Sequence, residues 1–178
     1  QSSDGYTISA YLYRPPNLAP GVRIPGIVWV HGGPTGQYRD MFEPFGSGGS
    51  GDAQFFVKRG YAVLHPNIRG SSGYGKGFED GNNGCWGHCD LEDVLAGVEY
   101  QKTLPYIDGS KMGITGTSYG GIMSMNAVAF APGVFQAAIP ASGYSDWVHF
   151  YRGENELRHI KLLEYELGPF ADSEHKWR

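Results

Sequence analysis

The 178-residue sequence has only two cysteines, few charged side chains and no long hydrophobic run. No run approaches the roughly 18 apolar residues that a membrane span needs, so we expect no membrane segment. Charged residues make up 18% of the chain, below the usual share of about 25%. The net charge is −4 and no basic patch is visible, which argues against a nucleic-acid partner.

The two cysteines, Cys85 and Cys89, are too few for a disulfide framework. We expect them to be free, partly buried thiols, which favours a reducing compartment such as the cytoplasm. No signal peptide is visible, but a chain that opens at Gln1 rather than Met says little about targeting.

What the sequence does contain is typical of a folded domain. Hydrophobic residues reach 40% and aromatic residues 14%, which excludes intrinsic disorder, and the length suits one domain with a sizeable core. The 28 glycines indicate many tight turns. Residues Gly46–Gly51 have the composition of a flexible linker, either a natural surface loop or an engineered splice, and we assign them no chemistry.

Short apolar segments alternate with amphipathic ones along the chain. This pattern predicts an α/β fold with a mostly parallel sheet, buried on both faces and flanked by helices. The predicted strands are Tyr6–Tyr13, Gly26–His31, Tyr61–His65, Lys111–Thr115 and Phe135–Ile139. The predicted helices are His88–Thr103, Ser118–Phe130 and Glu154–Leu167.

One motif carries chemistry. Gly116–Gly120 reads G-x-S-x-G and stands between a predicted strand and a predicted helix, which is the context of a nucleophile elbow. Ser118 is therefore the candidate nucleophile, with the helix N-terminus behind it. The alternative is an ordinary glycine-rich turn.

A second glycine-rich turn agrees with this interpretation. His31–Pro34 follows a strand, and hydrolases use such turns to build an oxyanion hole. We expect the backbone N–H groups of Gly33 and Tyr119 to be the two donors. We expect His31 to be a structural histidine packed under the turn.

Four motifs together resemble one known family. HGGP, PNIRGSSGYGKGF, CWGHCDLEDV and GTSYGG occur in this order, as in the catalytic domain of the prolyl oligopeptidase family of serine peptidases. The acylaminoacyl peptidase and dipeptidyl peptidase branches look most similar, and the resemblance runs from Asp4 to Trp177. It implies that residues 1–178 are part of an α/β-hydrolase domain, which in the family is usually attached to a β-propeller.

The resemblance also implies an incomplete triad. The family's order is Ser, Asp, His, and the acid and the histidine lie after later strands. No segment after Ser118 resembles either site, so we expect this chain to hold the nucleophile and oxyanion donors without the base and the last strands. His149, His159 and His175 are weak alternatives for the base, as are Asp146 and Asp172 for the acid.

By position, the segment Ala141–Trp147 corresponds to the family's pocket for the substrate side chain. Tyr144, Trp147 and Tyr151 would give it an aromatic wall suited to proline or another apolar residue. The alternative is that these rings are ordinary core aromatics.

Three other signals are set aside. Gly70–Lys76 resembles a phosphate-binding loop, but Gly77 stands where Ser or Thr is needed. The spacing in Cys85–Cys89 fits no usual zinc site, so we predict neither metal nor cofactor. Arg69 and Arg152 are more typical of structural ion pairs than of a binding site.

The resemblance thus predicts a serine-type peptidase that cleaves peptide bonds through an acyl-enzyme. The alternatives are an esterase or lipase of the same fold and a catalytically silent fragment that acts in folding or interaction. The expected partner is a peptide with an apolar side chain near the scissile bond. We also expect self-association through an exposed edge at Phe135–Ile139.

Overall fold

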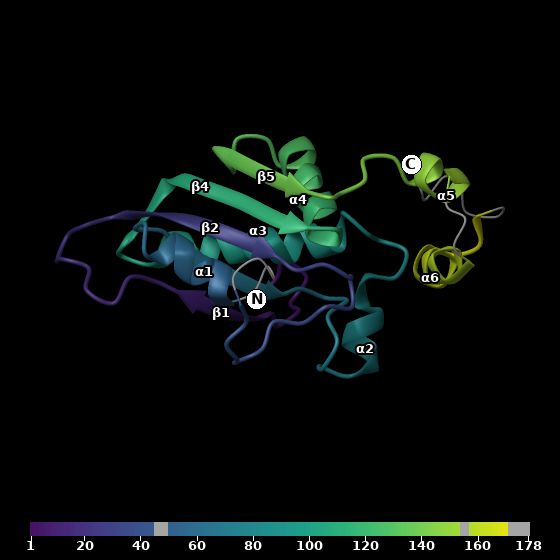
Figure 1. Ribbon diagram of the computed structural model, residues 1–178, viewed down its shortest axis with the longest axis horizontal. Coiled ribbons are helices and arrows are strands. Elements are labelled where there is room, and N and C mark those ends of the chain that lie inside the picture. The colour runs from purple at the N-terminus through teal and green to yellow at the C-terminus, as the bar shows by residue number, and fades with distance from the viewer. Residues whose placement is uncertain (45–49, 154–156, 171–178) are drawn as a thin grey trace.

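A five-stranded sheet organises the chain, in the order β1-β3-β2-β4-β5 (Figure 1). The computed structural model describes residues 1–44, 50–153 and 157–170. Strand β1 runs antiparallel to β3, and all other neighbouring strands are parallel. The mostly parallel α/β sheet predicted from the sequence is therefore confirmed. The strands are β1 Ser9–Tyr13, β2 Ile24–Val30, β3 Ala62–Asn67, β4 Ile107–Thr117 and β5 Ala137–Ala141.

Helices cover both faces of the sheet. Helices α3 (Cys89–Thr103) and α4 (Tyr119–Phe130) pack on one face, and α1 (Ser50–Val57) packs on the other. Helices α5 (Trp147–Gly153) and α6 (Leu157–Leu167) lie beyond the carboxyl ends of β4 and β5 (Figure 1).

Three of these helices were not predicted: α1, α5 and the short α2 (Lys76–Glu79), which a 3-10 turn at Asp80–Asn82 follows. Helix α1 begins inside the glycine-serine stretch, and the low helix propensity of glycine and serine gives no sign of a helix there. Ser50 and Gly51 of that stretch belong to α1, and residues 45–49 lie outside the described residues.

The core has two parts. The larger part lies between the sheet and helices α3 and α4, where Val28, Val94 and Met123 are fully buried. The smaller part lies under α1 and includes Ile27 and Val63. Every residue of β3 is buried, as expected for a strand covered on both faces.

Buried polar side chains tie the N-terminal segment to this core. The guanidinium of Arg69 lies 2.7 Å from Asp93 and 2.5 Å from Asp4, and its carbon lies 4.3 Å from the centre of the Tyr6 ring. The expected structural ion pairs of Arg69 are thus observed. Because Arg69 is itself buried, these contacts hold the chain start against β3 and α3.

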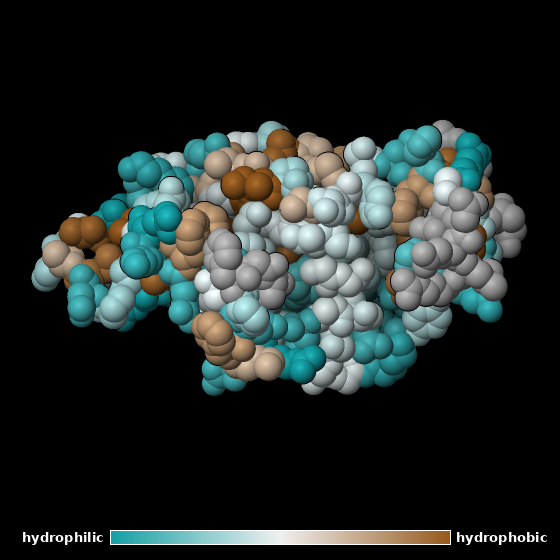
Figure 2. All heavy atoms as spheres, viewed as in Figure 1, coloured by the Kyte–Doolittle hydropathy of each residue, from teal (hydrophilic) through white to brown (hydrophobic). Residues whose placement is uncertain are grey.

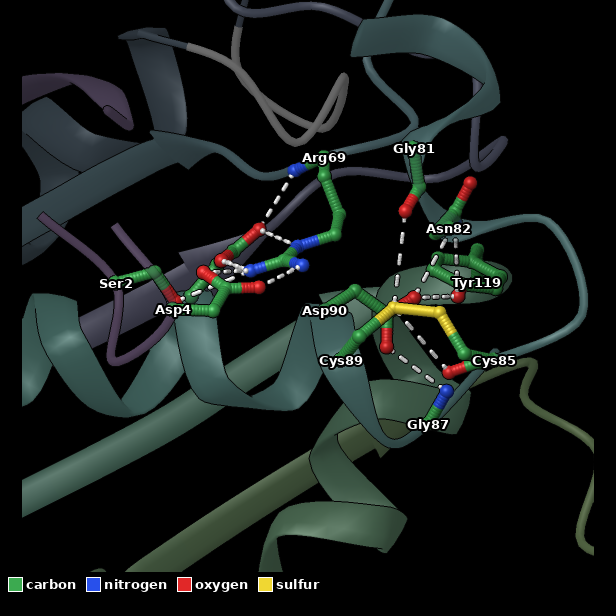
Figure 3. Close-up of a disulfide and its surroundings, with 11 residues drawn as sticks. Ser2, Asp4, Arg69, Gly81, Asn82, Cys85, Gly87, Cys89, Asp90 and Tyr119 are labelled. Carbon is green, nitrogen blue, oxygen red and sulfur yellow. Dashed lines mark hydrogen bonds and ion pairs between the residues drawn. A yellow bond between two sulfur atoms is a disulfide. The ribbon is translucent and has the colours of Figure 1, made fainter. Parts of the chain in front are cut away.

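The prediction of free thiols was wrong, because Cys85 and Cys89 form a disulfide (Figure 3). Gly84 and Gly87 adopt positive φ angles of 73° and 79°, which curl the chain into a tight turn before α3. The two Cα atoms consequently lie 5.7 Å apart, within the range that a disulfide spans. The cysteine content therefore no longer supports a reducing compartment.

The described part of the chain has neither a candidate membrane-spanning helix nor a candidate metal site. None of its helices is long and apolar enough to cross a bilayer. Nowhere in this part do three or more His, Cys, Asp or Glu side chains lie close enough together to hold a metal ion.

Candidate active site

Loops from neighbouring parallel strands meet at the carboxyl edge of the sheet. Val30 at the end of β2 pairs with Gly116, and Thr117 at the end of β4 pairs with Ala141 of β5. The turns that follow these strands therefore lie side by side. Such an edge is where α/β folds build their sites.

Ser118 lies at the sharpest of these turns. It is exposed, and its φ of 58° is uncommon for a residue other than glycine. Its N–H donates a 2.9 Å hydrogen bond to the carbonyl of Ala141, which fixes the turn against β5. Helix α4 begins at the next residue, as the nucleophile-elbow prediction requires.

The glycines of the motif are needed because the turn packs directly on the backbone of β2. A Cβ atom at Gly116 would lie 2.4 Å from the carbonyl oxygen of Val30, and one at Gly120 would lie 2.0 Å from the same oxygen. These distances are far below van der Waals contact. The G-x-S-x-G spacing is thus a steric requirement of this turn.

Both residues of the proposed oxyanion hole line the same pocket as the serine. A Cβ atom at Gly32 would lie 3.5 Å from the Cβ of Ser118, so the turn after β2 is in contact with the serine. Gly33 has a φ of 128°, which glycine alone adopts readily. Within the described chain, the N–H groups of Gly33 and Tyr119 donate to no other residue. Both are therefore available to a bound oxygen atom.

The side chain of Tyr119 belongs to a buried polar network (Figure 3). Its hydroxyl donates to the carboxylate of Asp90, which also accepts hydrogen bonds from Asn82 (3.2 Å) and the N–H of Gly87 (2.8 Å). Burial raises the pKa of Asp90 to about 6, against the lowering effect of these donors. Burial and the adjacent carboxylate raise the pKa of Tyr119.

His31 lies beneath the turn after β2, as predicted. Its Nδ1 is 2.8 Å from the carbonyl oxygen of Gly32, and its Nε2 is 2.8 Å from the hydroxyl of Ser71. Burial lowers the pKa of His31 and so favours the neutral ring. These contacts fit a structural role, because both ring nitrogens are engaged away from Ser118.

A pocket of about 200 Å³ opens beside the serine. Of the predicted side-chain pocket, Tyr144 and Trp147 line it. Tyr151 does not; its hydroxyl donates to Glu164 at 2.9 Å, and its ring stacks on Phe170. The complete lining is Gly33, Trp86, Ser118, Tyr119, Ile122, Tyr144, Trp147, Phe150, His159, Leu162 and Leu163.

Sequence reasoning missed several of these residues. Trp86 lies in the turn that the disulfide closes. In the sequence, the two cysteines of this turn raised the question of a zinc site and gave no indication of a pocket wall. Leu162 and Leu163 come from α6, a helix that the sequence predicted without predicting its position beside Ser118. His159 of α6 also lines the pocket, whereas His149 is exposed on α5.

Of the weak candidates for the acid, Asp146 makes a contact elsewhere. The carboxylate of Asp146 accepts the N–H of His149 at 2.7 Å at the start of α5. His175 and Asp172 lie outside the described residues.

Comparisons with known proteins agree with this geometry. A family model described as the prolyl oligopeptidase family matches residues 49–177. The uncharacterized peptidase YuxL of Bacillus subtilis is 33% identical over 99% of this chain, which covers 26% of that protein. This chain therefore spans about a quarter of the length of that relative.

Solved structures show the same fold. An acylaminoacyl peptidase in complex with Z-Gly-Gly-Phe-chloromethyl ketone matches 100% of this chain with a TM-score of 0.87 and 29% identity; the match covers 27% of that structure. A puromycin-hydrolyzing peptidase of Mycobacterium tuberculosis matches 99% of this chain with a TM-score of 0.88 and 28% identity, and the match covers 26% of it. The α/β-hydrolase prediction is thereby confirmed.

Proposed function

This chain belongs to the prolyl oligopeptidase family, and we propose that residues 1–178 form the nucleophile-bearing part of a serine peptidase catalytic domain. The observation that carries the proposal is the position of Ser118. It is exposed at a positive-φ turn, close to the N–H groups of Gly33 and Tyr119, which have no partner among the described residues. An exposed hydroxyl beside two such donors is the arrangement that acyl transfer requires.

The proposed chemistry follows from the geometry. The hydroxyl oxygen of Ser118 attacks the carbonyl carbon of a peptide bond, and the N–H groups of Gly33 and Tyr119 stabilise the tetrahedral oxyanion. The C–N bond then breaks, and the leaving amine takes a proton. Water hydrolyses the resulting acyl-enzyme and regenerates the serine.

A general base must take the proton of Ser118. The family resemblance assigns this role to a histidine that follows later strands, so we propose that the base comes from polypeptide outside residues 1–178. The chain covers 26% of the relative from Bacillus subtilis, which leaves ample sequence for it. Without a base the hydroxyl is a poor nucleophile at neutral pH.

We propose a peptide substrate with an apolar side chain next to the scissile bond. The pocket beside Ser118 offers Ile122, Phe150 and Leu163 together with the rings of Tyr144 and Trp147. Such a surface favours apolar groups over charged ones. The peptide-like inhibitor bound to the similar acylaminoacyl peptidase supports a peptide rather than a simple ester.

A fluorophosphonate probe tests the nucleophile. We expect it to label the longer protein that supplies the base, and we expect Ser118→Ala to abolish that label. Ser142→Ala is the matched control, because Ser142 is an exposed serine with a φ of 50° in the adjacent loop. The 178-residue chain alone should take up little label, because it lacks the proposed base. Absence of label in the longer protein would contradict the proposal.

We also propose that a second copy pairs along β5. This strand ends the sheet on the side away from β1, and Ile139 is 61% exposed on it. Figure 2 shows hydrophobic side chains over the sheet between β4 and β5, on the face that carries α1. An open strand edge offers unpaired N–H and C=O groups to another chain.

Sedimentation velocity over a range of concentrations tests this pairing. We expect a concentration-dependent dimer that Ile139→Lys abolishes. Val128→Lys is the control, because Val128 is 53% exposed but lies on α4. A monomer at all concentrations would contradict the pairing.

A further inference from the structure

A second, larger cavity of about 520 Å³ adjoins the pocket of Ser118. We call it the lateral cavity. Trp86, Tyr144 and Trp147 line both hollows, so their side chains form the partition between the two. The remaining lining of the lateral cavity is Gly87, His88, Asn126, Phe130, Ser145, Asp146, Val148 and Arg152.

The two hollows differ in chemistry. Apart from the serine turn and His159, the pocket of Ser118 is walled by apolar and aromatic side chains. The lateral cavity adds His88, Asn126, Asp146 and Arg152 to its wall. The partition therefore separates an apolar hollow beside the serine from a polar one further away.

Trp86 is the buried member of the partition. Its side chain is 8% exposed, whereas Tyr144 is 43% exposed. Its ring packs edge-on against Tyr119, with 5.0 Å between ring centres, and its centre lies 5.0 Å from that of Trp147. The indole thus rests on the residue that follows Ser118 and spans the gap to α5.

The backbone around Trp86 is fixed on both sides. The disulfide between Cys85 and Cys89 closes the turn that carries it. The N–H of Gly84 donates to the carbonyl of Glu166 at 2.6 Å, and the N–H of Gly87 donates to Asp90 at 2.8 Å. A ring held in this way keeps its position when a ligand presses against it.

We propose that Trp86 is a specificity-determining residue that sets the depth of the Ser118 pocket. This inference rests on the proposed peptidase function. With Trp86 in place, a substrate side chain next to the scissile bond ends at the partition, and a bicyclic aromatic side chain is too long. Shortening Trp86 joins the pocket to the lateral cavity, so longer side chains enter.

The test measures binding, because binding does not require a general base. The probes are the N-acetyl amides of proline, phenylalanine and 2-naphthylalanine, and ligand-observed NMR gives their dissociation constants for the 178-residue chain. For Trp86→Ala we expect the affinity ratio of the naphthyl probe to the proline probe to rise about tenfold. For Trp86→Phe we expect a smaller rise in the same direction.

Phe130→Ala provides a matched control, because Phe130 lines the lateral cavity but not the pocket. With Trp86 present, this change should leave the binding of the naphthyl probe unaltered. In the Trp86→Ala background, it should weaken that binding. Circular dichroism establishes that each variant is folded, and Trp86→Phe carries the test where Trp86→Ala does not fold.

The outcomes separate the inference from the proposed function. An unchanged ratio in the folded variants overturns the role of Trp86, as does an effect of Phe130→Ala while Trp86 is present. Failure of Ser118 to react with the fluorophosphonate in the longer protein that supplies the base, together with the expected shift in the ratio, overturns the peptidase proposal and leaves the partition standing. Absence of binding by every probe overturns both.

Discussion

The hydroxyl of Tyr119 donates a hydrogen bond to the buried carboxylate of Asp90, so the residue after Ser118 is anchored at its far end. Asp90 belongs to the first turn of α3, next to the disulfide (Figure 3). The anchor connects the N-termini of α3 and α4. The backbone N–H of Tyr119 is positioned by a network that does not itself touch the serine.

Removing the hydroxyl of Tyr119 should destabilise the fold, because the buried carboxylate of Asp90 then loses a hydrogen-bond donor. In Tyr119→Phe, the donors that remain to Asp90 within the described part of the chain are Asn82 and the N–H of Gly87. We expect a loss of about 1–3 kcal/mol in the free energy of unfolding, measured by urea denaturation. The pKa of Asp90 should also rise above its value of about 6, because the bond from Tyr119 lowers it. Tyr100→Phe, at a ring that is 50% exposed, should change stability by less than about 0.5 kcal/mol.

The turn at Ser118 should not tolerate a methyl group at Gly120. A Cβ there would meet the carbonyl oxygen of Val30 at 2.0 Å, and a backbone atom cannot rotate away. We expect Gly120→Ala to cost about 3 kcal/mol or more in thermal or urea unfolding. Gly77→Ala is the control, because a Cβ there meets nothing within 4 Å. Since Gly77 lies in α2, that change should range from neutral to a gain of about 1 kcal/mol.

Acid should destabilise the fold through His65. This residue is fully buried, neither ring nitrogen has a hydrogen-bond partner among the described residues, and burial lowers its pKa to about 3. Between the ordinary pKa of about 6.5 and this value, the unfolded chain binds a proton that the folded chain does not. The stabilising contribution of the neutral ring is complete above about pH 6.5 and falls as the pH drops toward 3, by about 1.4 kcal/mol per pH unit.

The effect of His65 must be isolated from carboxyl groups that act in the opposite sense. Burial raises the pKa of Asp90 to about 6 and that of Glu166 to about 7, so their contributions grow as the pH falls. Comparison with His65→Phe cancels these groups. The difference in unfolding free energy between the two proteins should change with pH from 6 to 4, and a flat difference would contradict the assignment.

Opening the disulfide should loosen the partition. The bond closes a loop with a sequence separation of 4, and the chain-entropy account gives about 2 kcal/mol for so short a loop. We expect Cys85→Ser with Cys89→Ser to lower stability by about that amount. Alkylation of the unreduced, denatured chain followed by mass spectrometry should find no free thiol. Uptake of the alkylating agent at either cysteine would show that the bond is absent.

The strands and the serine turn could be predicted because their signals are local. The apolar segment before Gly116 predicted a strand, and the order of strand, G-x-S-x-G and helix predicted the exposed Ser118. Helix α1 could not be predicted, because it begins in a glycine-serine stretch of low helix propensity. Its formation depends on packing against β3.

The rest of the pocket depends on contacts between distant segments. Trp86, Trp147 and Leu163 lie far apart in the sequence, and no periodicity connects them. The disulfide was missed for a related reason, since counting cysteines ignores how positive-φ glycines bend the chain between them. Tyr151 shows the converse error, because its position after Trp147 suggested the pocket while its hydroxyl contacts Glu164 on α6.

The hydrogen bond from the N–H of Ser118 to the last carbonyl of β5 has a mechanical consequence. Because β5 is the outermost strand and fixes the turn that carries Ser118, a displacement of β5 also displaces the serine. A second copy that pairs along β5 should therefore change the position of the Ser118 hydroxyl.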